Sequence, residues 1–75
     1  MTITYNTERI LAEISSTGTS AKRLTLTGWN GRESKLDLRV WRTDEEPAKP
    51  GKGITLAPDE AEALYNALRE YLKKP

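Results

Sequence analysis

Residues 22–41, KRLTLTGWNGRESKLDLRVW, decide the fold of this 75-residue chain. Apolar and polar side chains alternate in two runs, residues 22–29 and 35–42, and a period of two is typical of strands. Asn30 and Gly31 form the pair that most strongly favours a hairpin turn, and we expect this turn to extend through Ser34. The stretch therefore predicts an antiparallel hairpin with its leucines on one face.

The flanking segments add two strands and a helix to this hairpin. Residues 43–53, which are rich in proline and glycine, predict a loop, and residues 53–56 predict a short strand. Pro58 opens a predicted helix over residues 58–73, whose apolar side chains recur at helical spacing. Residues 3–15 fit a strand with a bulge near Asn6 and Thr7, which we favour, although a helical turn also fits this apolar run.

These elements predict one α+β domain over residues 1–75, in the order ββββα. We expect a four-stranded antiparallel meander with the C-terminal helix packed on its apolar face. Because so short a chain buries only about 60% of its unfolded surface, we also expect a homodimer. The residues predicted to form the core and the dimer seam are Ile54, Leu56, Leu64, Tyr65, Leu68 and Leu72.

The composition excludes several classes of function. The chain has neither cysteine nor histidine, so disulfides, thiolate or imidazole metal sites and Ser-His triads are excluded. We therefore expect no metal, no cofactor and no enzymatic activity. The sequence has no apolar run long enough for a membrane span and no signal-peptide pattern, so we expect an intracellular protein, cytoplasmic and nucleoid-associated if bacterial.

Charge and aromatic residues point to a binding surface on the central hairpin. The formal net charge is +1, but residues 22–52 hold eight basic against five acidic residues. The hairpin face opposite the leucines carries both tryptophans, Trp29 and Trp41, among Arg23, Lys35 and Arg39. Rings that stack bases among cations that meet phosphates are what single-stranded nucleic acid requires. The alternative is that the tryptophans are packing residues, covered by the N-terminal strand or by a dimer partner.

The segment from Lys49 to Gly53 places two lysines, Lys49 and Lys52, in a glycine-rich stretch. It lacks the spacing of a phosphate-binding P-loop. Two flexible lysines could hold a phosphate backbone, and the alternative is a simple solvated loop.

Three motifs resemble the positive cofactor four family of transcriptional coactivators. They are Gly28-Trp29-Asn30-Gly31, the strand Leu36–Trp41 (LDLRVW), and Lys49–Leu56 (KPGKGITL) followed by Pro58. The W-N turn, the D-[IL]-R-x-W strand and the G-K-G-I-T-L segment are most similar to the bacterial YdbC-like branch. The resemblance covers about residues 22–70.

The resemblance implies a homodimer formed largely through the helices, which binds single-stranded DNA across its sheets with little sequence preference. It implies that Trp29 stacks on a base, and it assigns the strand contacts to Arg39 and Trp41. Asn30 stands where eukaryotic members have a lysine, and the turn is one residue longer, which affects the placement of Arg32. The nucleic-acid-binding residues expected from pattern and resemblance are Lys22, Arg23, Trp29, Asn30, Arg32, Lys35, Arg39, Trp41, Lys49 and Lys52.

We therefore expect a non-catalytic, homodimeric single-stranded DNA-binding protein that acts in transcription regulation or in DNA replication and repair. Partly opened duplex is a further expected ligand, and RNA polymerase or replication factors are candidate partners. Two alternatives stay open: an RNA-binding or RNA-chaperone protein that uses the same face, and a protein-interaction module that docks on the transcription machinery.

Overall fold

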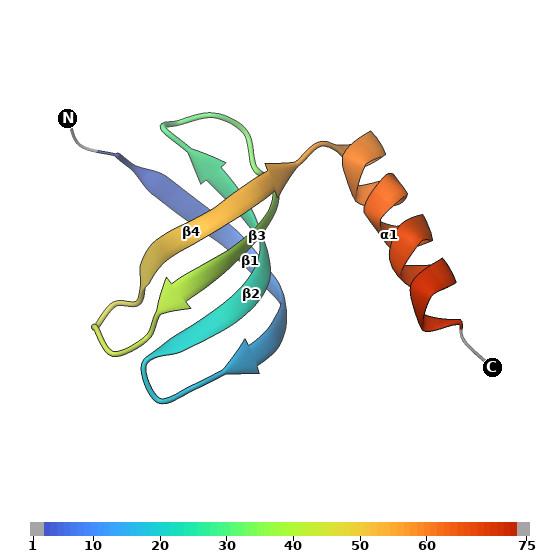
Figure 1. Ribbon diagram of the computed structural model, residues 1–75. Coiled ribbons are helices and arrows are strands. Elements are labelled where there is room, and N and C mark those ends of the chain that lie inside the picture. Colours follow the sequence, from blue (N-terminus) through green and yellow to red (C-terminus); the bar gives the residue numbers. More distant parts are fainter. Residues whose placement is uncertain (1–2, 74–75) are drawn as a thin grey trace.

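The computed structural model describes residues 3–73 and has the element order ββββα (Figure 1). The four strands form one antiparallel sheet in the order β1-β2-β3-β4. Their bounds, followed by those of the helix, are β1 Tyr5–Ser16, β2 Ser20–Trp29, β3 Lys35–Arg42, β4 Lys49–Leu56 and α1 Pro58–Leu72. The predicted fold class, strand order and C-terminal helix are confirmed.

The central hairpin of β2 and β3 forms as its alternation predicts. Leu24 pairs with Leu38 and Thr25 with Asp37, so like side chains share a face. Asn30 and Gly31 both have positive φ, 53° and 79°, a backbone conformation that asparagine and glycine adopt most readily. The Arg32 N–H donates to the Trp29 carbonyl at 3.0 Å and closes the turn.

The N-terminal apolar run, which fits either a strand or a helical turn in sequence, forms a strand. β1 is a single twelve-residue strand, and its pairing with β2 shifts register three times, first between Thr7 and Arg9. Such irregularities bend a strand and increase its twist. β1 can therefore curve with the strongly twisted sheet that Figure 1 shows.

β4 is longer than predicted, because Lys49–Lys52 belongs to the strand and not to the preceding loop. Proline and glycine suggested a loop, but β4 is an edge strand, where a missing N–H and a close backbone approach are both tolerated. A Cβ at Gly53 would lie 2.5 Å from the Leu38 carbonyl oxygen, so glycine lets β4 approach β3 there. The register shifts between Arg39 and Trp41, opposite this stretch.

The core lies on the sheet face that the sequence pattern assigned to solvent. We call this face the aromatic face; it carries Tyr5, Thr25, Thr27, Trp29, Asp37, Arg39 and Trp41. Thr25, Thr27 and Asp37 are wholly buried there, and Trp41 is 5% exposed. The opposite face, which we call the leucine face, carries Leu24, Leu26, Leu36, Leu38 and Leu56, and all five are half-buried. The reason is curvature, since Tyr5 of β1 reaches across to the ring of Trp41 on β3, with centroids 5.7 Å apart.

Helix α1 does not pack on the apolar face of its own sheet, which corrects the prediction. Pro58 occupies its first turn, and the Ala57 N–H donates to the Glu60 carboxylate at 2.8 Å, so the start of the helix is as expected. One residue, Ala57, joins β4 to α1, too little chain for the helix to turn back across the sheet. It projects from the end of β4 instead (Figure 1), and none of its residues, all within the described range, is buried.

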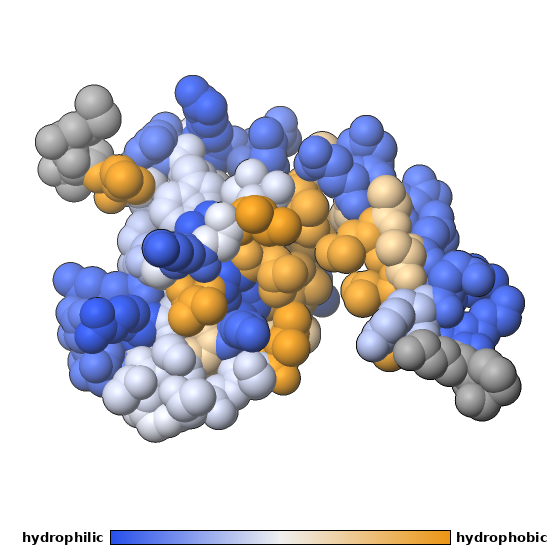
Figure 2. All heavy atoms as spheres, viewed as in Figure 1, coloured by the Kyte–Doolittle hydropathy of each residue, from blue (hydrophilic) through white to orange (hydrophobic). Residues whose placement is uncertain are grey.

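Ile54 and the apolar residues of α1, which were predicted to form the core, are therefore exposed to solvent in the single chain. Ile54 is 55% exposed, and the apolar stripe of α1 is also accessible to solvent. In Figure 2 apolar side chains gather on the side of the sheet nearest α1 and on the side of α1 that faces it. Within residues 3–73, no helix is both long and apolar enough to span a bilayer.

Candidate nucleic-acid interface

The centre of the aromatic face is a hydrogen-bonded group around the buried carboxylate of Asp37. Arg39 donates to it twice, from Nε at 2.8 Å and from Nη2 at 3.0 Å. The Trp29 indole N–H donates to Oδ2 of the same carboxylate at 3.0 Å. The remaining Arg39 nitrogen, Nη1, donates to the Gly51 carbonyl at 2.9 Å, which ties β3 to β4.

Trp29 contacts both a cation and a second aromatic ring. The Arg39 guanidinium carbon is 4.6 Å from the centroid of the indole, within the range of a cation–π contact. The Tyr5 ring lies 5.4 Å from the indole at an interplanar angle of 42°. Trp29 is half-buried and Tyr5 is 38% exposed, so this pair presents aromatic surface to solvent.

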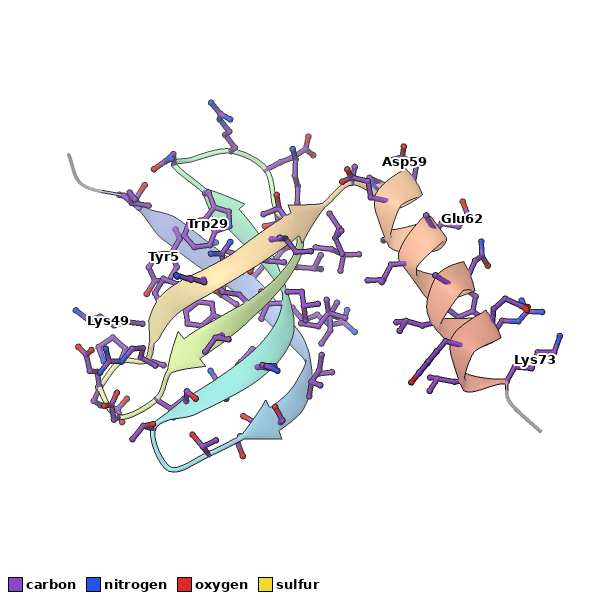
Figure 3. All side chains as sticks on the ribbon, in the orientation of Figure 1. Tyr5, Trp29, Lys49, Asp59, Glu62 and Lys73 are labelled. Carbon is purple, nitrogen blue, oxygen red and sulfur yellow. The ribbon has the colours of Figure 1, made fainter. Side chains whose placement is uncertain are left out.

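Basic side chains flank Trp29 on both sides, in two shallow cavities that share this residue. One cavity, of about 420 Å³, is lined by Tyr5 and Trp29 together with Arg39 and Lys49. The other, of about 120 Å³, is lined by Trp29, by the basic Arg32 and Lys35, and by the acidic Glu33, together with two threonines. In Figure 3, Tyr5, Trp29 and Lys49 lie on the part of the sheet remote from α1. Five of the expected residues, Trp29, Arg32, Lys35, Arg39 and Lys49, therefore line these two cavities.

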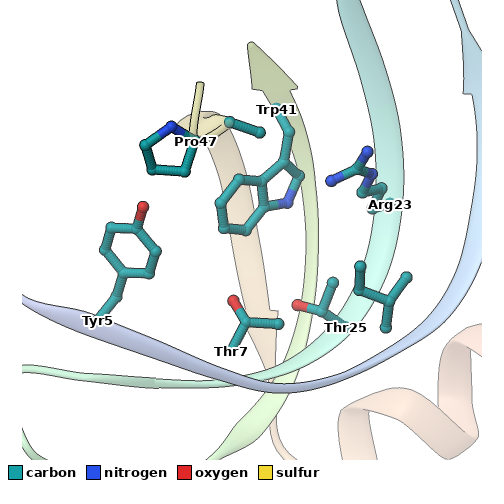
Figure 4. Close-up of a pocket in the computed structure, with 8 residues that line it drawn as sticks. Tyr5, Thr7, Arg23, Thr25, Trp41 and Pro47 are labelled. Carbon is teal, nitrogen blue, oxygen red and sulfur yellow. The ribbon is translucent and has the colours of Figure 1, made fainter. Parts of the chain in front are cut away.

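Trp41 lies deeper than a stacking platform requires. With 5% of its surface exposed, it packs at the base of a cavity of about 230 Å³, between Tyr5, Pro47 and Thr25 (Figure 4). Its indole nitrogen is buried and has no hydrogen-bond partner among the described residues. In this conformation Trp41 is therefore a packing residue, which is the alternative that the sequence left open. A base could stack on its ring only by entering the cavity.

The remaining predicted residues are dispersed. Arg23 lines the Trp41 cavity, where its Nε lies 3.4 Å from the Glu13 carboxylate. Lys22 pairs with Val40 and, by strand alternation, lies on the leucine face. Lys52 is exposed near the register shift of β4.

Asn30 has a structural role in the turn. Its backbone N–H donates to the Thr4 carbonyl at 2.8 Å, and its side-chain oxygen accepts from the Thr4 N–H at 3.3 Å. These bonds hold the chain that precedes β1 against the hairpin turn.

The loop between β3 and β4 is acidic and pairs with basic residues at the ends of these two strands. Arg42 donates to Asp44 at 3.2 Å, and this hydrogen bond and the negative charge raise the pKa of Arg42 above its ordinary value. Lys49 is 3.9 Å from the Glu45 carboxylate, at the mouth of the same loop. The acidic residues therefore reduce the positive charge at one end of the aromatic face.

Two residues of the site, Tyr5 and Asp37, were not among those predicted. Asp37 reads in sequence as one half of a surface ion pair, yet it is wholly buried. Its position two residues before Arg39, on the same strand face, was the signal that the two side chains could meet. Tyr5 gave no such signal, since its contacts depend on how β1 curves.

Comparison with known proteins identifies a family and one relative of this chain. The family model described as "Transcriptional Coactivator p15 (PC4)" matches residues 17–67. A protein of Treponema pallidum (strain Nichols), described as an uncharacterized protein, is 35% identical over 72 residues, which cover 95% of this chain and 82% of that protein. The matched family segment includes β2, β3, β4 and most of α1, whereas Tyr5 lies outside it.

Proposed function

The chain belongs to the PC4 family of transcriptional coactivators, and from this premise we propose that it is a homodimeric single-stranded DNA-binding protein of low sequence specificity. The observation that carries the proposal is Trp29, a half-buried ring flanked by basic side chains in two adjoining cavities. Such a ring stacks on any base, because every base has a π-face. Low sequence specificity follows, since stacking does not read base edges.

The DNA backbone is expected to follow the basic residues on either side of Trp29. Arg32 and Lys35 line one cavity, and Lys49 lines the other. Arg23, in the Trp41 cavity, extends the positive surface, while Lys22 on the leucine face and Asn30 in the turn are less suited to contact the same strand. A phosphate contact of the exposed Lys52 stays a prediction. Each phosphate that is neutralised steepens the fall of affinity with salt, by about 0.7 in the log–log slope.

The homodimer is proposed from the apolar surface that the single chain leaves uncovered. On α1, Leu64 is 36%, Leu68 48% and Leu72 72% exposed. A second copy, related by a two-fold axis, would cover this stripe and the leucine face with the same residues from the other chain. Two copies of the aromatic face would then serve one assembly, which suits looped or partly opened DNA.

The process served is proposed to be transcription regulation, with DNA replication or repair as the other settings for the same ligand. RNA polymerase or a replication factor is the protein partner that fits these settings. Membership of the bacterial YdbC-like branch stays a prediction.

The test is an anisotropy titration of a labelled oligo-dT strand with the full chain at low and high salt. We expect binding that weakens as salt rises and that unlabelled oligo-dT competes away, with duplex of the same length a poor competitor. Stronger competition by oligo-U would instead assign the face to RNA, because contacts to the 2′-hydroxyl separate the two nucleic acids. Absence of binding at low salt would contradict the proposal.

A further inference from the structure

Asp37 is a buried carboxylate that accepts hydrogen bonds from two side chains of the interface. Its side chain has no exposed surface, and its two oxygens accept three hydrogen bonds, one from Trp29 and two from Arg39. Burying a carboxylate is costly unless it is paired and hydrogen-bonded. The arrangement satisfies Asp37 only while both side chains keep their present orientation, so Asp37 constrains them both.

The first consequence concerns the ring of Trp29. The indole is held at its edge by Asp37, at 3.0 Å, while the Arg39 guanidinium lies 4.6 Å from its centre. Two contacts of different kinds, edge and face, define the plane of a ring that otherwise turns about two side-chain bonds. A ring that is already fixed loses less conformational freedom when a base stacks on it.

The second consequence concerns Arg39. All three of its side-chain nitrogens donate within the chain, two to Asp37 and one to the Gly51 carbonyl, and its side chain is 15% exposed. Its charge is balanced by a carboxylate at 2.8 Å. Two of its five N–H hydrogens remain for another acceptor, but they belong to a largely buried guanidinium whose charge the carboxylate already balances.

We propose that Asp37 is a positioning residue: it sets the plane of Trp29 for base stacking and keeps Arg39 from contacting the phosphate backbone. The inference rests on the proposed function and deepens it, since it assigns the cations at the interface to different tasks. Arg39 orients the ring, and Arg32, Lys35 and Lys49 meet phosphates. The resemblance to the family gave Arg39 a direct contact, so the two assignments differ in what salt dependence they predict.

The test is a double-mutant cycle between Asp37 and Trp29 with oligo-dT affinity as the readout. We expect Asp37→Ala to weaken binding about fivefold and Trp29→Ala about tenfold, because loss of one stacked base accounts for effects of this size. In the Trp29→Ala background, Asp37→Ala should no longer weaken binding, since that weakening passes through the ring. A merely structural role for Asp37 would lower affinity equally in both backgrounds, and that result would overturn the proposal.

A second variant keeps the test valid if Asp37→Ala does not fold. Asp37→Leu combined with Arg39→Met replaces the buried pair by apolar side chains of similar size, a change that is often neutral or stabilising. Trp29 still loses its acceptor, so the same cycle with Trp29→Ala applies. Here the log–log salt slope should equal that of the wild type, whereas a slope shallower by about 0.7 would show that Arg39 meets a phosphate and would overturn its assignment.

The matched control is Asp44→Ala, which removes a carboxylate paired with Arg42 two residues away, as Asp37 is paired with Arg39. Asp44 lies in the loop between β3 and β4, and its loss should leave affinity within about twofold of the wild type. Failure of the wild type to bind oligo-dT would contradict the proposed function itself. Normal wild-type binding with additive effects of Asp37→Ala and Trp29→Ala would contradict only the positioning role.

Discussion

At the scale of single residues, the two tryptophans that look equivalent in sequence have different environments. Trp29 is half-buried and lines two cavities that also contain basic side chains, whereas Trp41 is 5% exposed beneath Tyr5 and Pro47. Both rings belong to the same sheet face, and what covers each ring separates their roles, since Tyr5 of β1 and Pro47 of the loop lie over Trp41. Substitutions at the two positions should therefore act on different properties of the protein.

Trp29→Ala should weaken oligo-dT binding about tenfold, because one stacked base contributes about 1–3 kcal/mol. It should also lower the free energy of unfolding by about 1–3 kcal/mol, because the buried Asp37 carboxylate loses one hydrogen bond. Trp29→Phe, which keeps a ring, should lose less. Anisotropy titration measures the affinities, and circular dichroism checks the fold. Equal affinities of wild type and Trp29→Ala would exclude Trp29 as the stacking ring.

Trp41→Ala should instead lower the free energy of unfolding by about 3–5 kcal/mol, the usual cost of removing a large buried ring. Thermal unfolding followed by circular dichroism measures the change. An unchanged melting temperature would mean that Trp41 is not a packing residue.

At the scale of elements, the sequence pattern predicted β2, β3 and α1 well because their periodicity is local. The start of β4 could not be predicted in this way, because proline and glycine favour loops except where a neighbouring strand approaches closely. Nor could local alternation say which face is buried: Leu24 and Thr25 alternate as expected, yet Thr25 is the wholly buried one. That outcome depends on the register shifts in β1 and on contacts distant in sequence, such as Tyr5 with Trp41.

Gly53→Ala tests the close approach of β4 to β3. The added methyl group would lie 2.5 Å from both the Arg39 Cβ and the Leu38 carbonyl oxygen, so the strands must separate. We expect a loss of about 1–3 kcal/mol in unfolding free energy, as for other overpacked sites. Gly18→Ala is the control, since a Cβ there meets nothing within 4 Å, and its melting temperature should match the wild type. Equal melting temperatures for both variants would contradict the account of β4.

At the scale of the whole molecule, the single chain buries the hydrogen-bonded group around Asp37. The apolar side chains of α1 and of the leucine face, in contrast, are exposed or half-buried. α1 has no buried residue among those described, and Tyr65 on its apolar stripe is 61% exposed. Removing such apolar surface from water lowers the free energy by roughly 25 cal/mol per Å². A second copy is the proposed cover, and it would leave both aromatic faces free for DNA.

Leu68→Glu should therefore dissociate the dimer, since it places a charge in the centre of the apolar stripe. Asn66→Glu adds the same carboxylate on another side of α1 and should leave the assembly intact. Light scattering coupled to size-exclusion chromatography gives the masses. A monomeric wild type, or a Leu68→Glu variant with the wild-type dimer mass, would contradict the proposed seam.

The measurement that tests the central claim most directly is intrinsic tryptophan fluorescence during titration with oligo-dT. We expect oligo-dT to quench the tryptophan fluorescence of the wild type at low salt and to quench it less at high salt. In Trp29→Phe, where the buried Trp41 is the remaining tryptophan, we expect little quenching. No quenching of the wild type at low salt would contradict base stacking on the aromatic face.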